Sequence, residues 1–166
     1  MSKDEIYTAD DSGGRPFRFN AAVAEVFPDM LRRSIPGYAA SIEAIGSLAA
    51  RYVTDNSNCY DLGCSLGAAT LAMQSGIRAK GCNIVAVDNA PAMIERCREV
   101  IALANDGESR TPVDVREADI MDTEISNASM VVMNYTLQFL DIETRDALVR
   151  RICDGLLPGG LFLLSE

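Results

Sequence analysis

The stretch that decides the fold is YDLGCSLGAAT, residues 60–70. The preceding apolar residues in NCYDLG (58–63) favour a strand, and SLGAATLAMQSG (65–76) predicts a helix that ends at Gly76. Gly63 and Gly67 allow the backbone to turn tightly and allow a ligand to come close. The segment is therefore expected to be a strand, a glycine loop and a helix whose positive N-terminal end faces the ligand.

Strands and helices alternate after this loop. Apolar patterns predict strands at 83–89, 112–120, 128–137 and 161–166, and helices at 39–53, 90–105 and 141–156. This alternation predicts an α/β fold with a doubly wound, mostly parallel sheet that is covered on both faces. Ligands of such sheets bind beyond the carboxyl ends of the strands.

The N-terminal part of the chain has less regular patterns. Residues 1–18 are polar and glycine-containing, and are expected to be disordered or extended. Residues 19–38 mix short helical patterns with expected breaks at Pro28 and Pro36. One domain is therefore expected to cover 19–166.

The composition excludes several classes of function. The 166 residues carry a formal net charge of -9 at pH 7, which disfavours direct binding of nucleic acid. The chain has no run of eighteen apolar residues and no apolar signal core at its start, so no membrane span and a cytoplasmic location are expected. Five cysteines without C-x-x-C spacing, in a chain with no histidine, predict reduced thiols and no metal site.

The glycine loop fits two chemistries. DLGCSLG (61–67) fits the loop that receives the amino acid tail of S-adenosylmethionine (SAM), whereas Gly63-Cys64-Ser65-Leu66-Gly67 satisfies G-x-S-x-G, the nucleophile elbow of serine hydrolases. A Ser-His-Asp triad needs an imidazole, and this chain has no histidine. The loop also lacks G-x-G-x-x-G, which argues against NAD. SAM is therefore favoured.

Polar residues follow at four successive strand ends. Asp61 is expected to meet an α-ammonium group, and Asp88 to accept both ribose hydroxyls. Asp119 is expected to accept from an adenine amino group, with the backbone N–H of Ile120 on the ring, and Asn134 to stand near the sulfonium. Each residue alone also fits a turn, a helix cap or a buried hydrogen bond. Together they favour a nucleoside that carries an amino acid.

Longer strings resemble a known family. Six segments are similar to the carboxy-S-adenosyl-L-methionine (carboxy-SAM) synthase family, which has the class I SAM-dependent methyltransferase, Rossmann-like fold: AEVFPDMLRRSIPGY, YDLGCSLGAATLAM, AVDNAPAMIERCR, TPVDVREADI, NASMVVMNYTLQFL and PGGLFLLSE. The likeness covers roughly residues 19–166. It implies SAM contacts at Tyr38, Gly63, Cys64, Ser65, Asp88, Asn89, Asp119, Ile120 and Asn134, all of which are present.

The resemblance also implies a reaction. SAM and prephenate would give carboxy-SAM and phenylpyruvate: prephenate loses carbon dioxide and hydroxide, the hydroxide deprotonates the sulfonium methyl group, and the resulting ylide captures the carbon dioxide. The site would hold SAM, carboxy-SAM or S-adenosylhomocysteine (SAH). The product would serve modification of the tRNA wobble uridine to its 5-oxyacetic acid form by a separate enzyme. A homodimer is implied as well.

The chain stops at Ser165-Glu166, at the end of an expected fifth strand. A class I fold continues with a helix and two more strands, and the family has a further arginine for the second carboxylate of prephenate, so the chain is expected to be a truncated, incomplete domain. No catalytic residue is assigned, and neither Arg32 nor Arg33 is assigned to prephenate. The alternatives are a plain SAM-dependent methyltransferase and a SAM-binding fragment without turnover.

Overall fold

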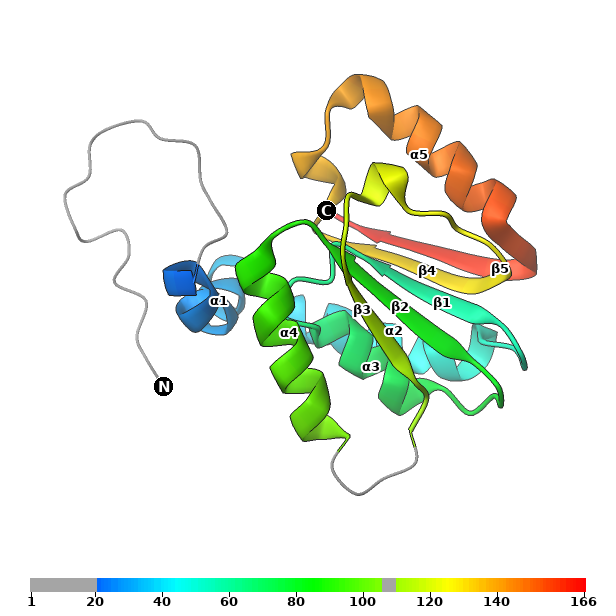
Figure 1. Ribbon diagram of the computed structural model, residues 1–166, viewed down its shortest axis with the longest axis horizontal. Helices are drawn as coiled ribbons and strands as arrows, with labels where there is room; N and C mark the ends of the chain where they lie inside the picture. The colour runs from blue at the N-terminus through cyan, green and yellow to red at the C-terminus, as the bar shows by residue number, and fades with distance from the viewer. Residues whose placement is uncertain (1–20, 106–109) are drawn as a thin grey trace.

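Five parallel strands form one sheet in the computed structural model, which describes residues 21–105 and 110–166 (Figure 1). The segment expected to be disordered, 1–18, lies outside these residues. The strand order is β3-β2-β1-β4-β5. The strands are β1 (Asn58–Leu62), β2 (Asn83–Asp88), β3 (Val113–Glu117), β4 (Ala128–Asn134) and β5 (Leu156–Ser165).

Strand order and direction confirm the predicted fold class. The chain runs outward from β1 to β3 and then returns to place β4 on the other side of β1, where it pairs in parallel register from Asn58↔Ala128 to Asp61↔Val132. The order therefore reverses between β1 and β4. In open α/β sheets, such a reversal creates a crevice at the carboxyl ends of the strands.

Five α-helices and two 3-10 turns accompany the strands in the described residues. They are α1 (Ala21–Ser34), α2 (Tyr38–Tyr52), α3 (Ala68–Gly76), α4 (Pro91–Ala104), η1 (Ile120–Asp122), η2 (Leu137–Phe139) and α5 (Ile142–Gly155). The prediction of a helix break at Pro28 is wrong, because α1 continues through it to Ser34. A proline removes one helical hydrogen bond, and here the helix is also held by packing of buried Phe27 against Ala90 and Met93.

The helices cover both faces of the sheet, as expected for a doubly wound fold. Figure 1 shows α2, α3 and α4 on one side and α5 on the other. Successive residues of β1 alternate between these layers: Cys59 packs in the cluster that contains Ile45 and Met73, whereas Leu62 packs in the cluster that contains Leu148 and Ile152. This period of two places Asp61 on the α2–α3 side.

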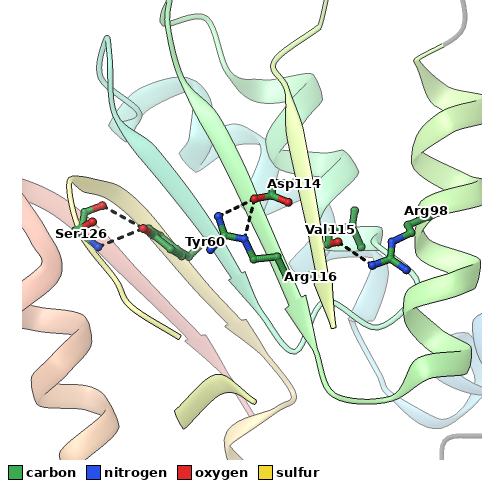
Figure 2. A network of polar contacts seen from close by, with 6 residues as sticks. All are labelled: Tyr60, Arg98, Asp114, Val115, Arg116 and Ser126. Atoms are coloured by element: carbon green, nitrogen blue, oxygen red, sulfur yellow. Dashed lines mark hydrogen bonds and ion pairs between the residues drawn. The ribbon is translucent and has the colours of Figure 1, made fainter. Parts of the chain in front are cut away.

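Polar side-chain contacts support β3 and the segment before β4, as Figure 2 shows. The Tyr60 hydroxyl donates to the carbonyl of Ser126 and accepts from its backbone N–H, each at 3.2 Å. Arg98 of α4 donates to the carbonyl of Val115 on β3 at 3.2 Å. These contacts hold β3 and the segment before β4 in place. The residues that make them do not line the cavity described below.

β5 forms one edge of the sheet in the described chain. Its apolar side chains are half-buried from Leu161 to Leu163, and Leu164 is 44% exposed. Among residues 21–105 and 110–166, no helix has the length and apolar character that a membrane crossing requires.

Candidate functional site

A cavity of about 880 Å³ lies at the carboxyl ends of the strands. Its floor comes from the segments that follow β1, β2, β3 and β4, and its wall comes from α1 and α2. Ten of the eleven residues predicted to form the site line this cavity: Tyr38, Asp61, Gly63, Cys64, Ser65, Asp88, Asn89, Asp119, Ile120 and Asn134.

The glycine loop is tied to the end of β2. The backbone N–H groups of Gly63 and Cys64 both donate to the carbonyl of Val87, at 2.8 and 2.9 Å. Gly63 has a φ of 85°, and a Cβ atom there would lie 2.3 Å from the Thr136 hydroxyl oxygen. Glycine is therefore required at this position both by backbone conformation and by the close approach of the segment after β4.

Gly67, the eleventh predicted residue, does not line the cavity. It precedes α3 with a φ of 85°, and a Cβ atom there would lie 2.9 Å from the Cys97 sulfur of α4. Its role in the structure is to turn the chain into α3 while α4 packs closely against the loop.

Asp61 is the most deeply buried acid of the cavity, at 1% exposure. One carboxylate oxygen accepts from the Thr70 hydroxyl at 2.6 Å, and the other, Oδ1, is buried without a hydrogen-bond partner. Burial raises the pKa of Asp61 to about 6. The negative charge of Asp88 adds a smaller upward contribution, whereas the hydrogen bonds from Thr70 lower the pKa. An unpartnered buried carboxylate oxygen is costly, so this atom is a natural acceptor for a cationic group.

Asp88 closes β2 and already holds the loop in shape. Its two carboxylate oxygens accept from the backbone N–H groups of Ser65 and Ala90, each at 2.9 Å. Burial raises the pKa of Asp88, and these backbone hydrogen bonds oppose the rise. The carboxylate can still accept further hydrogen bonds, because each of its oxygens accepts about two.

Asp119 and Ile120 begin the turn after β3. The Asp119 carboxylate accepts from the backbone N–H of Met121 at 2.7 Å and so caps η1. Arg151 of α5 donates to the carbonyls of Ile120, at 2.6 Å, and Met121. The turn is thus held from both sides, and Ile120 is buried at the cavity.

Asn134 and Tyr135 close β4. The Asn134 side-chain oxygen is buried without a hydrogen-bond partner. Tyr135 follows with a φ of 58°, and its ring centroid lies 6.2 Å from that of Tyr38, with the planes tilted by 34°. Burial raises the pKa of Tyr38, with further upward contributions from Asp61 and Tyr135.

The wall of the cavity is largely apolar. It includes Phe27, Met30, Leu31, Ile35 and Ile42 from α1, α2 and the turn between them. Arg32 lines the cavity, whereas Arg33 is absent from the lining and pairs with Asp29 at 3.5 Å. Sequence patterns could not separate these two arginines, because the direction of each side chain depends on how α1 is placed.

Ser65 has the left-handed backbone that a nucleophile elbow also has, with a φ of 49°. Its hydroxyl, however, meets the Met93 sulfur at 3.8 Å rather than a base. Since the whole chain has no histidine, the triad arrangement has no candidate base of that type.

Within residues 21–105 and 110–166, no group of three or more cysteine, aspartate or glutamate side chains is placed to hold a metal ion. All five cysteines are free thiols: four are buried and Cys153 is exposed. Burial raises the pKa of Cys59 to about 12, so this thiol remains protonated near neutral pH.

The residues that line or support the cavity but do not follow from the sequence patterns include Thr70, Tyr135 and Thr136. Thr70 lies on α3 nine residues after Asp61, and no short pattern marks it as the partner of that acid. Tyr135 and Thr136 directly follow Asn134, so their position after an apolar strand was the available signal.

Comparisons with known proteins agree with this architecture. A family model described as a methyltransferase domain matches residues 60–160. Among solved structures, a putative SAM-dependent methyltransferase from Methanococcus maripaludis superimposes with a TM-score of 0.67 at 20% identity, covering 92% of this chain and 66% of that one. The DhpI-SAM-HEP complex gives a TM-score of 0.61 at 20% identity, with 86% and 59% coverage. At these identities the structures support the fold alone.

Curated relatives have higher sequence identity. A carboxy-SAM synthase from Vibrio campbellii is 56% identical over 163 residues, which are 98% of this chain and 65% of the relative. Another from Photorhabdus laumondii is 53% identical over 164 residues, 99% of this chain and 64% of the relative. The chain thus spans a little less than two thirds of the length of these relatives.

The family match and the strand order lead to one assignment. The matched residues run from β1 into β5 and include most of the sheet and the glycine loop. The chain belongs to the methyltransferase domain family and has the class I SAM-dependent methyltransferase fold.

Proposed function

We propose that the cavity binds SAM and that the protein acts as a carboxy-SAM synthase. The observation that carries the binding proposal is the convergence of two unpartnered buried oxygens, on Asp61 and Asn134, into one cavity with the glycine loop. The synthase proposal rests on the 53–56% identity to proteins of that name over 98–99% of this chain.

The residues fit the parts of SAM. The Asp61 Oδ1 atom would accept from the α-ammonium group, and the α3 N-terminus with its preceding loop would face the carboxylate. The remaining lone pairs of Asp88 would accept from the ribose hydroxyls, with Asn89 beside them. Asp119 and Ile120 would meet adenine, and Asn134 and Tyr38 the sulfonium end.

The proposed reaction combines SAM with prephenate. Decarboxylation of prephenate releases carbon dioxide and hydroxide as the ring becomes aromatic; the hydroxide takes a proton from the sulfonium methyl group; and the methyl carbon bonds to the carbon dioxide. The products are carboxy-SAM, phenylpyruvate and water, so atoms and charge balance. No protein base is required, which suits a chain without histidine.

In this mechanism the protein supplies placement and exclusion of water. The apolar wall of α1 and α2 would shield the reacting groups, and the polar floor would hold the nucleoside. Arg32 is a cation among the described residues that line the cavity.

Two measurements test the proposal. Calorimetry with the 166-residue chain should detect SAM binding. Mass spectrometry should then detect carboxy-SAM after incubation with SAM and prephenate, for this chain and for a form extended to the length of its relatives. If neither form produces carboxy-SAM, and SAH appears when a methyl acceptor is supplied, the synthase proposal is wrong and the protein is a plain methyltransferase.

The family description favours that second candidate, because a methyltransferase domain also transfers methyl groups from SAM. A third outcome is that this chain binds SAM without turnover. Activity in the extended form, but not in this chain, would identify that outcome. As parts of the same proposal, the protein is cytoplasmic and homodimeric, and its product serves tRNA wobble uridine modification without direct contact between this protein and the tRNA.

A further inference from the structure

We propose that the ring of Tyr135 makes the site select a positively charged sulfur over a neutral one, that is, SAM over SAH. This inference rests on the proposed function, since it concerns the ligand of the same cavity. It assigns a specificity-determining role to a residue outside the predicted set of site residues.

The order of the strands places Tyr135 at the sulfur end of the ligand. Moving along the sheet from β3 to β4, the cavity meets Asp119, Asp88, Asp61 and then Asn134 with Tyr135. Neighbouring strands lie about 4.8 Å apart, so the end of β4 is roughly 10 Å from the end of β2. A nucleoside with its ribose at Asp88 and its base toward β3 therefore presents its sulfur toward β4.

Two tyrosine rings line this end of the cavity. Tyr135 follows β4, Tyr38 begins α2, and their centroids are 6.2 Å apart, within the range of direct aromatic contact. Tyr38 also lies close enough to Asp61 that the carboxylate contributes to the raised pKa of its phenol, after burial. The pair therefore lies beyond β1 and β4, on the side away from Asp119.

The backbone holds Tyr135 in an uncommon conformation. Its φ of 58° is left-handed, which few tyrosines adopt. The backbone N–H donates to the carbonyl of Ser165 at 2.8 Å, which fixes the residue against the end of β5. Such conformations concentrate at binding sites, where the surrounding structure maintains them.

An aromatic face attracts a cation through its quadrupole, within about 6 Å of the ring centre. A sulfonium gains from this attraction, and the neutral thioether of SAH does not. The carboxylates of Asp61 and Asp88 also favour a cation in the cavity. A change at Tyr135 alone leaves both acids in place, so the contribution of the ring can be separated from theirs.

The test compares two substitutions of equal backbone demand. Tyr135→Phe keeps the ring and Tyr135→Leu keeps apolar bulk without it; both carry a Cβ at the same positive φ. Calorimetry measures the dissociation constants of SAM and SAH for each, with Leu103→Ala as a control, because Leu103 is 76% exposed on α4. Thermal unfolding verifies that each variant is folded.

Tyr135→Leu is expected to weaken SAM roughly five- to thirtyfold and to change SAH less than about twofold, while Tyr135→Phe keeps the wild-type ratio. Equal loss of both ligands would overturn the inference, because the ring would then provide packing alone. Loss of selectivity in Tyr135→Phe would assign the effect to the hydroxyl group and also overturn it. If the wild-type chain binds neither ligand, the proposed function fails instead.

Discussion

Replacing Asp61 by asparagine should change how the stability of the protein depends on pH. The Asp61 carboxyl has an ordinary pKa of 3.8, and burial raises it to about 6 in the folded chain. This difference corresponds to roughly 3 kcal/mol, at about 1.4 kcal/mol for each pH unit. Because the folded state holds the proton more tightly than the unfolded state, ionisation of Asp61 destabilises the fold.

The sign and the window follow from these two values. Below pH 3.8 both states are protonated and the penalty is absent; between 3.8 and about 6 it grows; above 6 it is complete. The free energy of unfolding of the native chain, minus that of Asp61→Asn, should therefore fall by up to about 3 kcal/mol from pH 4 to pH 7. The amide group of Asn does not titrate, so any loss of stability that it causes is the same at each pH. That loss therefore cancels when the stability difference is compared between two pH values.

Urea unfolding of both proteins at half-unit steps from pH 4 to pH 8 measures this difference. SAM affinity, measured in parallel, should rise with pH through the same window, because an α-ammonium group favours the ionised carboxylate. A stability difference that stays flat across the window would refute the burial argument. Thr70→Val provides a directional check, since loss of the 2.6 Å hydrogen bond should move the transition to higher pH.

Three further predictions concern the rest of the site. Asp88→Ala should weaken SAM binding by roughly 1.5–3 kcal/mol in calorimetry, the range for hydrogen bonds to a charged group; unchanged affinity would contradict the ribose assignment. In urea unfolding, Gly63→Ala should destabilise the chain by more than Gly159→Ala. Both glycines have a positive φ, but only Gly159 has open space for a Cβ. Equal losses of about 1–2 kcal/mol would mean that backbone strain alone, and not the contact with Thr136, sets the cost. Arg151→Met should lower SAM affinity several-fold, because the turn at Ile120 loses the hydrogen bond that holds it. Calorimetry under conditions in which both proteins are fully folded measures this change. If only thermal unfolding changes, the role of Arg151 is purely structural.

Sequence patterns predicted which residues lie at the cavity where a polar residue ends an apolar strand. Asp88 and Asn134 stand in such places, and both line the cavity. The same reasoning failed for Pro28, where tertiary packing of α1 overrides a local helix-breaking tendency. The spacing of Gly67 in the loop predicts a place at the ligand, yet the nearest side chain to this glycine belongs to Cys97 of α4.

What the sequence alone determined is the set of local elements and the groups that close them. Periodicity distinguishes strands from helices, and the glycine loop needs residues that tolerate a left-handed turn; both properties belong to neighbouring residues along the chain. What only the tertiary structure decided is which groups remain unpartnered and which meet. The free oxygen of Asp61, the approach of Thr136 to Gly63 and the pairing of Tyr38 with Tyr135 join segments distant in sequence. Such contacts depend on strand order and helix placement, which no local pattern encodes.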